Sequence, residues 1–221
     1  FSIPDGWEWT SLSNLTRVLN GRAYSKEELL DAGTPVLRVG NLFTSNHWYY
    51  SDLELEPEKY CNKGDLIYSW SASFGPFIWN GPKVIYHYHI WKLSLFDETS
   101  YSKDFLYKFL LEKTAEIKAA GHGVSMVHMT KEKMEKLPVP VPPLAEQHRI
   151  VAKIDELMAL CDQLEAEQGD ATSAHARLVE TLLGTLTQST DAADLAANWQ
   201  RLAEHFDTLF TTEASIDVLK Q

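Results

Sequence analysis

The sequence is poor in the features that mark disulfide-rich, zinc-binding and membrane proteins. It has only two cysteines, Cys61 and Cys161, and no Cys/His cluster at zinc spacing, which argues against a disulfide framework or a structural zinc site. No stretch approaches about 18 uninterrupted apolar residues, and the first residues have neither the basic nor the apolar segment of a signal peptide. We therefore expect a protein of the reducing cytoplasm that builds its core without staples.

Basic residues are also in short supply, and they are unevenly distributed. The chain has 20 Lys and Arg against 31 Asp and Glu, a net charge of −11. Residues 142–221 account for −9 of this charge and are rich in Ala, Leu, Glu and Gln, whereas residues 1–141 hold all but three of the aromatic residues and are nearly neutral. This contrast predicts two domains, a compact aromatic domain over residues 1–141 and an acidic helical region over residues 142–221.

The first domain alternates strand and helix signals. Runs of β-branched and aromatic residues bounded by Gly, Pro or Asn predict strands, and capping residues before apolar positions at helical spacing predict helices. This mixture favours an α+β fold, with helices grouped around a sheet, over a regular doubly wound fold. The expected strands are residues 35–39, 65–70, 77–79 and 83–93, and the expected helices are residues 25–33, 102–120 and 130–137.

The second region carries a heptad pattern. Apolar positions recur at spacings of four and three from Ile150 to Leu182, which is typical of a coiled-coil seam that is weakest near Gly169. This helix must pair with something, and the sequence leaves open whether its partner is the rest of the chain or another chain. A second amphipathic stretch, from Leu195 to Leu209, predicts another helix, capped by Thr190 or Asp191.

Alternating prolines join the two regions. Residues 137–143 contain four prolines, and because proline disfavours helix in the residue before it, the segment is predicted to be a stiff extended strut.

A search for catalytic chemistry finds none. The Pro142-Pro143 pair is flanked by Val141 and Leu144, so it lacks the Asp or Asn and the aromatic residue of an amino-methyltransferase motif. The closely spaced glycines of residues 121–123 follow a helix rather than open one, unlike those of a phosphate loop, and no nucleophile elbow occurs. We expect a protein without a catalytic site.

Two histidines are spaced for metal binding. His87 and His89 are expected to point from one face of their strand, but their neighbours on that face are Ile85, Trp91 and Leu93. We interpret them as partly buried structural side chains, and we predict no metal site.

Residues 137–157, LPVPVPPLAEQHRIVAKIDEL, resemble the conserved region of the specificity subunit of type I restriction-modification enzymes, in which a Pro-Pro-Leu-Ala-Glu-Gln-like signature opens a long helix. Weaker similarities follow the order of the family. Residues 3–9 resemble its domain opening, residues 33–41 its Gly-x-Pro strand, and residues 63–67 the strand that follows. The resemblance extends over most of the chain.

This resemblance implies a target recognition domain in residues 1–141, which reads one half of a bipartite DNA target, and a helical spacer in residues 142–221, which docks other subunits. Specificity subunits carry two such pairs in tandem, so the chain resembles half of a subunit. The implied partners are double-stranded DNA, the methyltransferase and restriction subunits, and a second half-subunit or helix. S-adenosylmethionine, ATP and Mg²⁺ are expected on the partner subunits, and no cofactor is expected on this chain.

The resemblance also directs attention to the side chains that would contact DNA. Donors and acceptors on loops would read base edges, and basic residues on one face would contact phosphates. The near-neutral charge of residues 1–141 is unusual for a DNA-binding domain, so the partner subunits are expected to clamp the DNA backbone. The predicted DNA-binding residues are Arg22, Lys26, Arg38, Asn41, Asn46, His47, Ser71, Ser73, Lys83, His122, Ser125 and Lys131.

The spacer is predicted to act as a ruler. A continuous helix over residues 143–188 would span on the order of 67 Å, one to two turns of duplex at about 34 Å per turn. The alternative is a compact helical hairpin, which Gly169 and Gly184 favour. The predicted docking and spacer residues are Pro142, Pro143, Glu146, Gln147, Ile150, Ile154, Leu157, Leu164, Leu178 and Leu182.

Two other functions fit parts of the sequence. A stand-alone DNA-modification enzyme would need an S-adenosylmethionine site, for which no glycine loop is visible. A non-DNA interaction module would bind a protein with its acidic helices and a peptide or sugar with its aromatic domain. Calorimetry with S-adenosylmethionine, and DNA binding with the methyltransferase subunit present, separate these two from a specificity module.

Overall fold

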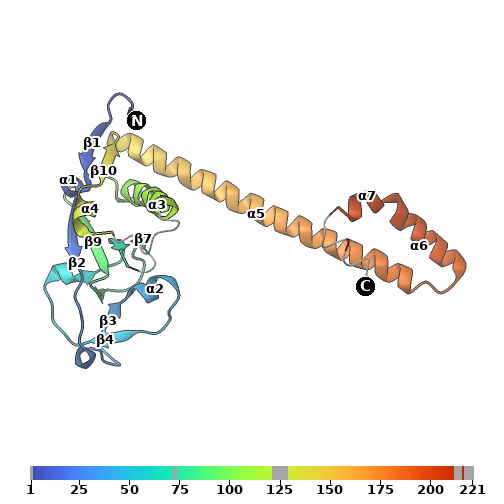
Figure 1. Cartoon of the computed structure of the whole chain (residues 1–221), viewed down its shortest axis with the longest axis horizontal. Helices are drawn as coiled ribbons and strands as arrows, with labels where there is room; N and C mark the ends of the chain where they lie inside the picture. Colours follow the sequence, from blue (N-terminus) through green and yellow to red (C-terminus); the bar gives the residue numbers. More distant parts are fainter. Residues whose placement is uncertain (1, 72–73, 121–128, 212–215, 217–221) are drawn as a thin grey trace. The chain divides into compact units, whose positions relative to one another are not determined.

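The computed structural model describes residues 2–71, 74–120, 129–211 and 216. The fold is α+β, and the chain divides into two compact units, Phe1–Lys153 and Ile154–Gln221. Figure 1 shows the strands gathered in the first unit, and the long helix α5 (Leu144–Thr187) begins there and continues into the second. None of the helices in the described ranges is long and apolar enough to span a membrane.

The strands of the first unit form three sheets. The smallest is an antiparallel pair of β1 (Glu8–Ser11) and β10 (Pro138–Val141). The second has the antiparallel order β2 (Thr16–Asn20), β9 (Ile90–Leu95), β6 (Leu66–Ser69) and β7 (Gly75–Ile78). The third, whose β3–β8 pair is parallel, has the order β4 (Tyr49–Ser51), β3 (Thr34–Leu37), β8 (Val84–Tyr86) and β5 (Tyr60–Cys61).

Strand β6 is buried on both faces, which explains its unbroken apolar run. Leu66 and Tyr68 belong to a core cluster that also contains Leu106 and Leu110 of α3 (Lys103–Ala120), whereas Ile67 belongs to a second cluster with Leu37 of β3. Successive side chains of a strand point to opposite faces. Strand β6 therefore contributes side chains to both core clusters of the first unit, one cluster on each of its faces.

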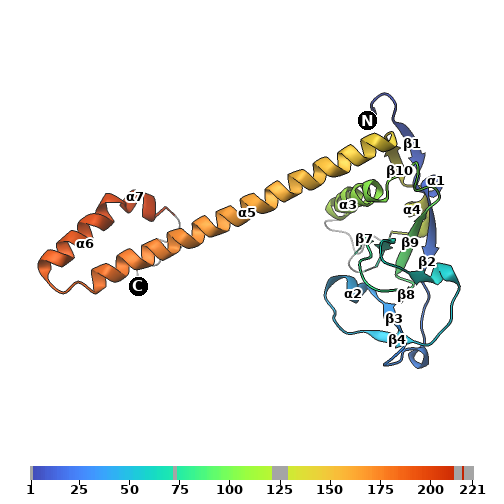
Figure 2. The same ribbon diagram turned by 180° about the vertical axis from the view of Figure 1, so that it is seen from behind.

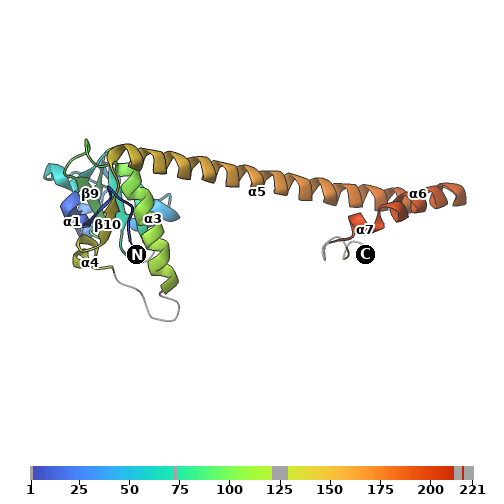
Figure 3. The same cartoon turned by 90° about the horizontal axis from the view of Figure 1, so that it is seen from above.

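Short helical segments complete the first unit, and several were predicted from their caps. The capping box at Ser25 opens only a 3₁₀ turn, η1 (Lys26–Glu28), while Thr130 accepts a hydrogen bond from the Lys133 N–H at the start of α4 (Lys131–Glu135). Figure 3 shows α3 beside β10, where Leu106 packs in the cluster that includes Val139. The remaining segments are α1 (Leu12–Leu15), α2 (Val39–Phe43) and η2 (Pro57–Lys59).

The prediction of one long strand over residues 83–93 is wrong. The run is two strands in different sheets, β8 pairing with β3 and β9 pairing with β2 and β6, joined by a turn at His87–His89. The Ile90 N–H donates to the His87 carbonyl oxygen at 2.9 Å across this turn. Both strands are largely buried, so neither shows an alternation of apolar and polar residues that the turn would interrupt.

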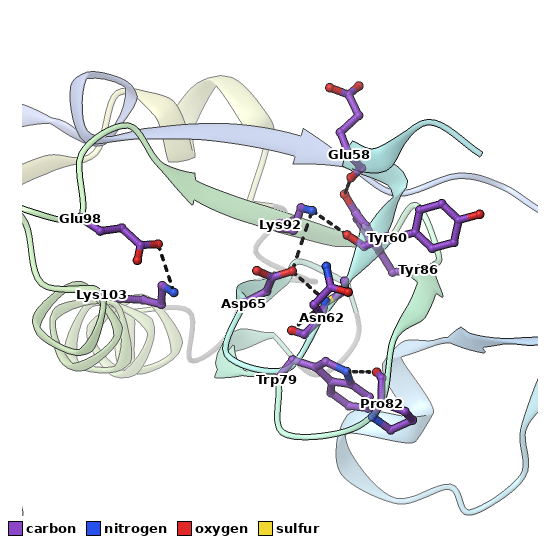
Figure 4. A network of polar contacts seen from close by, with 11 residues as sticks. Glu58, Tyr60, Asn62, Asp65, Trp79, Pro82, Tyr86, Lys92, Glu98 and Lys103 are labelled. Atoms are coloured by element: carbon purple, nitrogen blue, oxygen red, sulfur yellow. Dashed lines mark hydrogen bonds and ion pairs between the residues drawn. The ribbon is translucent and has the colours of Figure 1, made fainter. Parts of the chain in front are cut away.

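A polar network ties the two four-stranded sheets together (Figure 4). The Lys92 ammonium, whose side chain is only 11% exposed, donates to the Tyr60 carbonyl oxygen at 2.6 Å and lies 3.9 Å from the Asp65 carboxylate. The same Asp65 oxygen accepts the Asn62 N–H, and the Tyr86 hydroxyl donates to the Glu58 carbonyl oxygen. A largely buried lysine is tolerated here because its charge is paired and hydrogen-bonded.

The proline-rich segment is extended, as predicted, and it is a strand of the first unit. Beyond it, Gln147 in the first turns of α5 is buried, and its amide nitrogen donates to the carbonyl oxygens of Pro142 (2.8 Å) and Ser100 (3.3 Å) while its oxygen accepts the Ser102 N–H (2.7 Å). The compact units therefore divide between Lys153 and Ile154, twelve residues beyond the change in composition.

In the second unit the chain folds back on the end of α5, as Figure 2 shows. Asp191 caps α6 (Ala192–Glu204), as predicted, by accepting from the Ala193 and Asp194 N–H groups. Helix α6 is followed by α7 (Phe206–Leu209), and Leu202 and Leu209 are buried in a cluster with Val179 of α5. The other apolar positions of the predicted seam, Leu195, Trp199 and Phe206, are 44–59% exposed.

Candidate nucleic-acid interface

One pocket in the first unit collects side chains from two separate segments of the chain. It has a volume of about 360 Å³. One wall is the segment from the end of β3 through α2 to β4, and the other is the turn between β8 and β9. Its lining residues are Arg38, Val39, Gly40, Asn41, Ser45, His47, Tyr49, His87 and His89.

Asn41 folds the first wall. Its side-chain oxygen accepts the Arg38 N–H at 3.1 Å, and its amide nitrogen donates to the carbonyl oxygens of His47 (2.8 Å) and Ser45 (3.4 Å). The Asn41 side chain thus hydrogen-bonds the backbone on both sides of the short helix α2, a usual role for Asn at turns. Asn41 positions its neighbours, and its polar atoms are engaged within the protein.

The Tyr49 ring contacts two polar side chains of the pocket lining, those of Arg38 and His47. The Arg38 guanidinium carbon lies 5.2 Å from the centre of the Tyr49 ring, a cation–π distance. The His47 ring meets the same tyrosine edge to face, with centroids 4.7 Å apart. Both side chains are exposed, and both are groups that can donate hydrogen bonds to a ligand.

The second wall is a tightly bonded turn. The His87 N–H donates to the Leu37 carbonyl oxygen at 2.9 Å, and the Tyr88 N–H donates to the Arg22 carbonyl oxygen at 3.0 Å. Gly21 lets the neighbouring chain come this close, because a Cβ at that position would lie 2.2 Å from the His87 carbonyl oxygen. The turn is therefore fixed by backbone contacts with two other segments.

Aromatic side chains brace the same turn. The Trp70 indole N–H donates to the Tyr88 carbonyl oxygen at 2.9 Å, and its ring meets the His89 ring edge to face. Trp70 stacks in turn on Trp91, with centroids 5.7 Å apart. This bracing holds the two histidine rings at a fixed place, with centroids 4.9 Å apart.

The histidines of the turn are kept neutral near pH 7. The pKa of His87 is lowered to about 4, chiefly by burial and then by the neighbouring His89 and Arg38. Burial and Arg38 also lower the pKa of His89. A neutral imidazole has one donor and one acceptor nitrogen, so the pocket presents both kinds of hydrogen-bonding group beside a permanent positive charge.

Of the residues predicted to bind DNA, the fold brings Arg38, Asn41 and His47 together around this pocket. Asn46 is exposed in the same loop. Ser71 is half-buried just beyond β6, near the braced turn. Three others, Ser73, His122 and Ser125, lie outside the residues that the structure describes.

The remaining predicted cations lie apart from the pocket lining. The Arg22 guanidinium pairs with Glu28 and lies over the Tyr24 ring. The Lys83 ammonium lies 3.9 Å from the centre of the Tyr60 ring, and Lys131 pairs with Glu135 at 3.5 Å. Lys26 is exposed on η1. None of these four residues is among those that line the pocket.

Two side chains of the pocket were assigned other roles from the sequence. His87 and His89 were predicted to be structural residues of a strand, and the turn instead places them in the pocket wall. The length of the predicted strand could have indicated the turn, because eleven residues is twice the mean strand length of about 5–6. The ring of Tyr49, another lining residue, lies beside the Arg38 guanidinium.

The predicted docking residues fall into two groups. Gln147 is only 1% exposed and its amide is engaged within the first unit, so its side chain positions the start of α5 from inside that unit. Pro142 is also buried, whereas Pro143 is exposed. The others lie along α5: Glu146, Ile150, Ile154 and Leu182 are half-buried, and Leu157, Leu164 and Leu178 are 48–54% exposed.

The described residues offer hydrogen-bonding chemistry and no metal-binding constellation. No group of three His, Cys, Asp or Glu side chains among them could hold a metal ion. Burial raises the pKa of the Cys61 thiol to about 12, which leaves it protonated and a poor nucleophile near pH 7. What this pocket can do chemically is bind a polar, planar or anionic group.

Comparison with known proteins places these features in a family. Residues 4–171 match the family model described as the type I restriction modification DNA specificity domain. The chain is 34% identical to the specificity subunit of the type I restriction enzyme EcoAI and 33% identical to that of EcoEI, both from Escherichia coli. Each match covers the whole chain but only 40% and 39% of the relative, so the chain spans about two fifths of their length.

Solved structures show the same fold. The HsdS subunit of Thermoanaerobacter tengcongensis matches 76% of this chain and 41% of its own, with a TM-score of 0.61 and 22% identity. A chain from a structure of complex assembly and conformational transition of the type I R-M system matches 80% of this chain and 45% of its own, with a TM-score of 0.64 and 22% identity.

Proposed function

Because the chain belongs to the family of type I restriction-modification DNA specificity domains, we propose that it is a non-catalytic module that reads one half of a bipartite DNA target. Residues 1–141 are the target recognition domain in this proposal, and residues 142–221 are the spacer that docks the methyltransferase and restriction subunits. S-adenosylmethionine, ATP and Mg²⁺ belong to those partner subunits, and the complex acts in the cytoplasm.

The pocket lined by Arg38, His47, Tyr49, His87 and His89 is the observation that carries this proposal. It combines a guanidinium without a carboxylate partner in the described residues with neutral imidazoles on a braced turn. Base edges in the major groove present patterns of donors and acceptors that such side chains recognise. Rigid support is what selectivity requires, because a loose side chain adapts to more than one base.

The net negative charge of the chain implies a low affinity of this module for DNA on its own. Phosphate neutralisation supplies most non-specific affinity, and several cations of the first unit, including Arg17, Arg22 and Lys131, are paired with carboxylates. We infer that the partner subunits supply most of the contacts to the DNA backbone. The chain then contributes the reading of sequence more than the strength of binding.

Helix α5 supports the proposed docking role. Its exposed Leu157, Leu164 and Leu178 form a hydrophobic heptad seam on a long helix, and such a seam is stabilised by packing against another helix. A partner subunit or a second half-subunit is the proposed occupant of this seam.

Selection from random duplexes tests the proposal. The chain is mixed with a library of randomised 30-base-pair duplexes at fixed salt, with and without the methyltransferase subunit, and the bound DNA is sequenced. We expect one short motif to be enriched, with tighter binding when the methyltransferase subunit is present. Equal recovery of all sequences in both arms would contradict the proposal.

Calorimetry separates the stand-alone enzyme from the specificity module. We expect no heat of binding when S-adenosylmethionine is titrated into the chain alone. Saturable binding of S-adenosylmethionine, together with methyl transfer to DNA by the purified chain, would favour the enzyme.

A further inference from the structure

We propose that Arg38 reads the edge of a guanine base, with its guanidinium supported by the ring of Tyr49 and flanked by His87 and His89. This inference rests on the proposed function and names the base that the pocket recognises.

The Arg38 guanidinium is available for a ligand. Arg38 is exposed and lines the pocket, and the ion pairs of the described residues do not include it. Arg22 and Arg17 differ, because they pair with Glu28 and Glu58. A ligand therefore has no internal salt bridge to displace before it reaches Arg38.

Arg38 has contacts at both its backbone and its guanidinium. Its backbone N–H donates to the Asn41 side chain at 3.1 Å, and its guanidinium lies over the Tyr49 ring at 5.2 Å. The guanidinium is a planar fork of N–H donors, which suits two acceptors in one plane. Guanine offers two such acceptors, O6 and N7, in the major groove, and an Arg bidentate to them is the commonest specific contact.

The surroundings favour a base over a phosphate. Among the described lining residues, Arg38 is the only Lys, Arg, Asp or Glu, whereas contacts to the DNA backbone usually draw on several cations. His87 and His89 are neutral near pH 7 because burial lowers the pKa of both, so they add hydrogen-bonding groups and no charge. An adenine reading by Asn41 is disfavoured because its amide is already engaged.

The same duplex selection, repeated with Arg38→Lys and Arg38→Gln, tests the proposal. Lysine keeps the charge and loses the planar fork, while glutamine loses both. Arg149→Lys, at an exposed arginine of α5, is the matched control. Thermal melting of every variant establishes that the domain is folded, and competition binding is measured at several salt concentrations.

We expect the motif of the unaltered chain to contain a guanine, and preference at that one position to fall about 5- to 140-fold in both Arg38 variants, with the other positions unchanged. A motif that survives in Arg38→Lys, or one that lacks guanine, overturns this inference alone. So does uniform weakening across all sequences with a salt slope reduced by about one, the signature of a phosphate contact. A chain that enriches no motif refutes the proposed function, and this inference with it.

Discussion

The turn histidine His87 makes the stability of the first unit dependent on pH. Its pKa is near 6.5 in an unfolded chain and about 4 in the folded protein, mainly because of burial. Between these values the unfolded state binds more protons, so the folded state loses stability as the pH falls from 6.5 toward 4. We expect the free energy of unfolding to decrease over this range, measured by urea denaturation at a series of pH values.

A variant assigns that loss to the turn. His87→Gln should make the pH profile between 6.5 and 4 less steep, and His148→Gln, at an exposed histidine of α5, is the control. Loss of stability below about pH 4 should persist in both variants. Hydrogen bonds from Ser100 and Thr99 lower the pKa of Asp97 to about 2, so its contribution to the stability of the fold is lost as the carboxylate is protonated. A profile equally steep in His87→Gln and the unaltered chain would contradict the account.

Gly21 is required by the close approach of two backbones. A Cβ at this position would meet the carbonyl oxygens of His87 at 2.2 Å and Tyr86 at 2.5 Å. Because backbone cannot move aside as a side chain can, we expect Gly21→Ala to lower the free energy of unfolding by about 1–3 kcal/mol. It should also weaken selective DNA binding, because it displaces the turn.

The control for this prediction is a glycine with open space around it. Gly169 lies within α5, and nothing lies within 4 Å of the position of its added Cβ. Gly169→Ala should stabilise the helix by roughly 0.5–1 kcal/mol. Equal effects of the two substitutions, measured by chemical denaturation, would show that the packing around Gly21 has been misjudged.

Among the secondary-structure elements, the join between β10 and α5 depends on Gln147. Its buried amide makes hydrogen bonds with the backbone at Ser100, Ser102 and Pro142. We expect Gln147→Ala to cost about 1–3 kcal/mol, because it leaves buried backbone groups unsatisfied. Glu146→Ala, at the half-buried neighbour, is the control and should have a smaller effect. Denaturation that does not distinguish the two variants would assign Gln147 no structural role.

Elements with local signals were predicted well from the sequence. Three helices of the structure were predicted from local signals: the caps at Thr130 and Asp191 and the heptad pattern from Ile150 to Leu182. The boundary between β8 and β9 could not be predicted in the same way, because strands packed on both faces show no alternation that a turn would interrupt. The pairing of β10 with β1 also needs a partner more than one hundred residues away in the sequence.

The candidate site was predicted only in its loop half. Arg38, Asn41 and His47 were chosen for their chemistry on a polar loop, and the fold brings them to one pocket. His87 and His89 join them through the parallel pairing of β3 with β8, a contact between segments about fifty residues apart. No local pattern encodes that pairing, so the sequence alone could not place the two histidines beside Arg38.

For the whole molecule, the proposed ruler gives a prediction about spacing. Inserting four residues near Gly169 lengthens a helix by about 6 Å, close to two base pairs of duplex. In a full-length subunit, we expect the distance between the two recognised half-sites to change and each half-site sequence to stay the same. Selection from duplexes with variable spacers measures both quantities.

The control for the ruler keeps the helix length constant. Gly169→Ala alters the same position without an insertion and should leave the spacing unchanged. Altered half-site sequences, or an unaltered spacing after the insertion, would count against a ruler and in favour of a helical region that sets no distance.

Hydrogen–deuterium exchange of the chain with and without an enriched duplex tests the central claim, that the pocket is the DNA-reading surface, most directly. We predict slower backbone exchange at residues 38–49 and 86–90 when the duplex is bound, and little change at residues 16–20 and 129–137, where Arg17 and Lys131 line a separate groove. Protection confined to that groove, with exchange around Arg38 and His87 unaffected, would contradict the account.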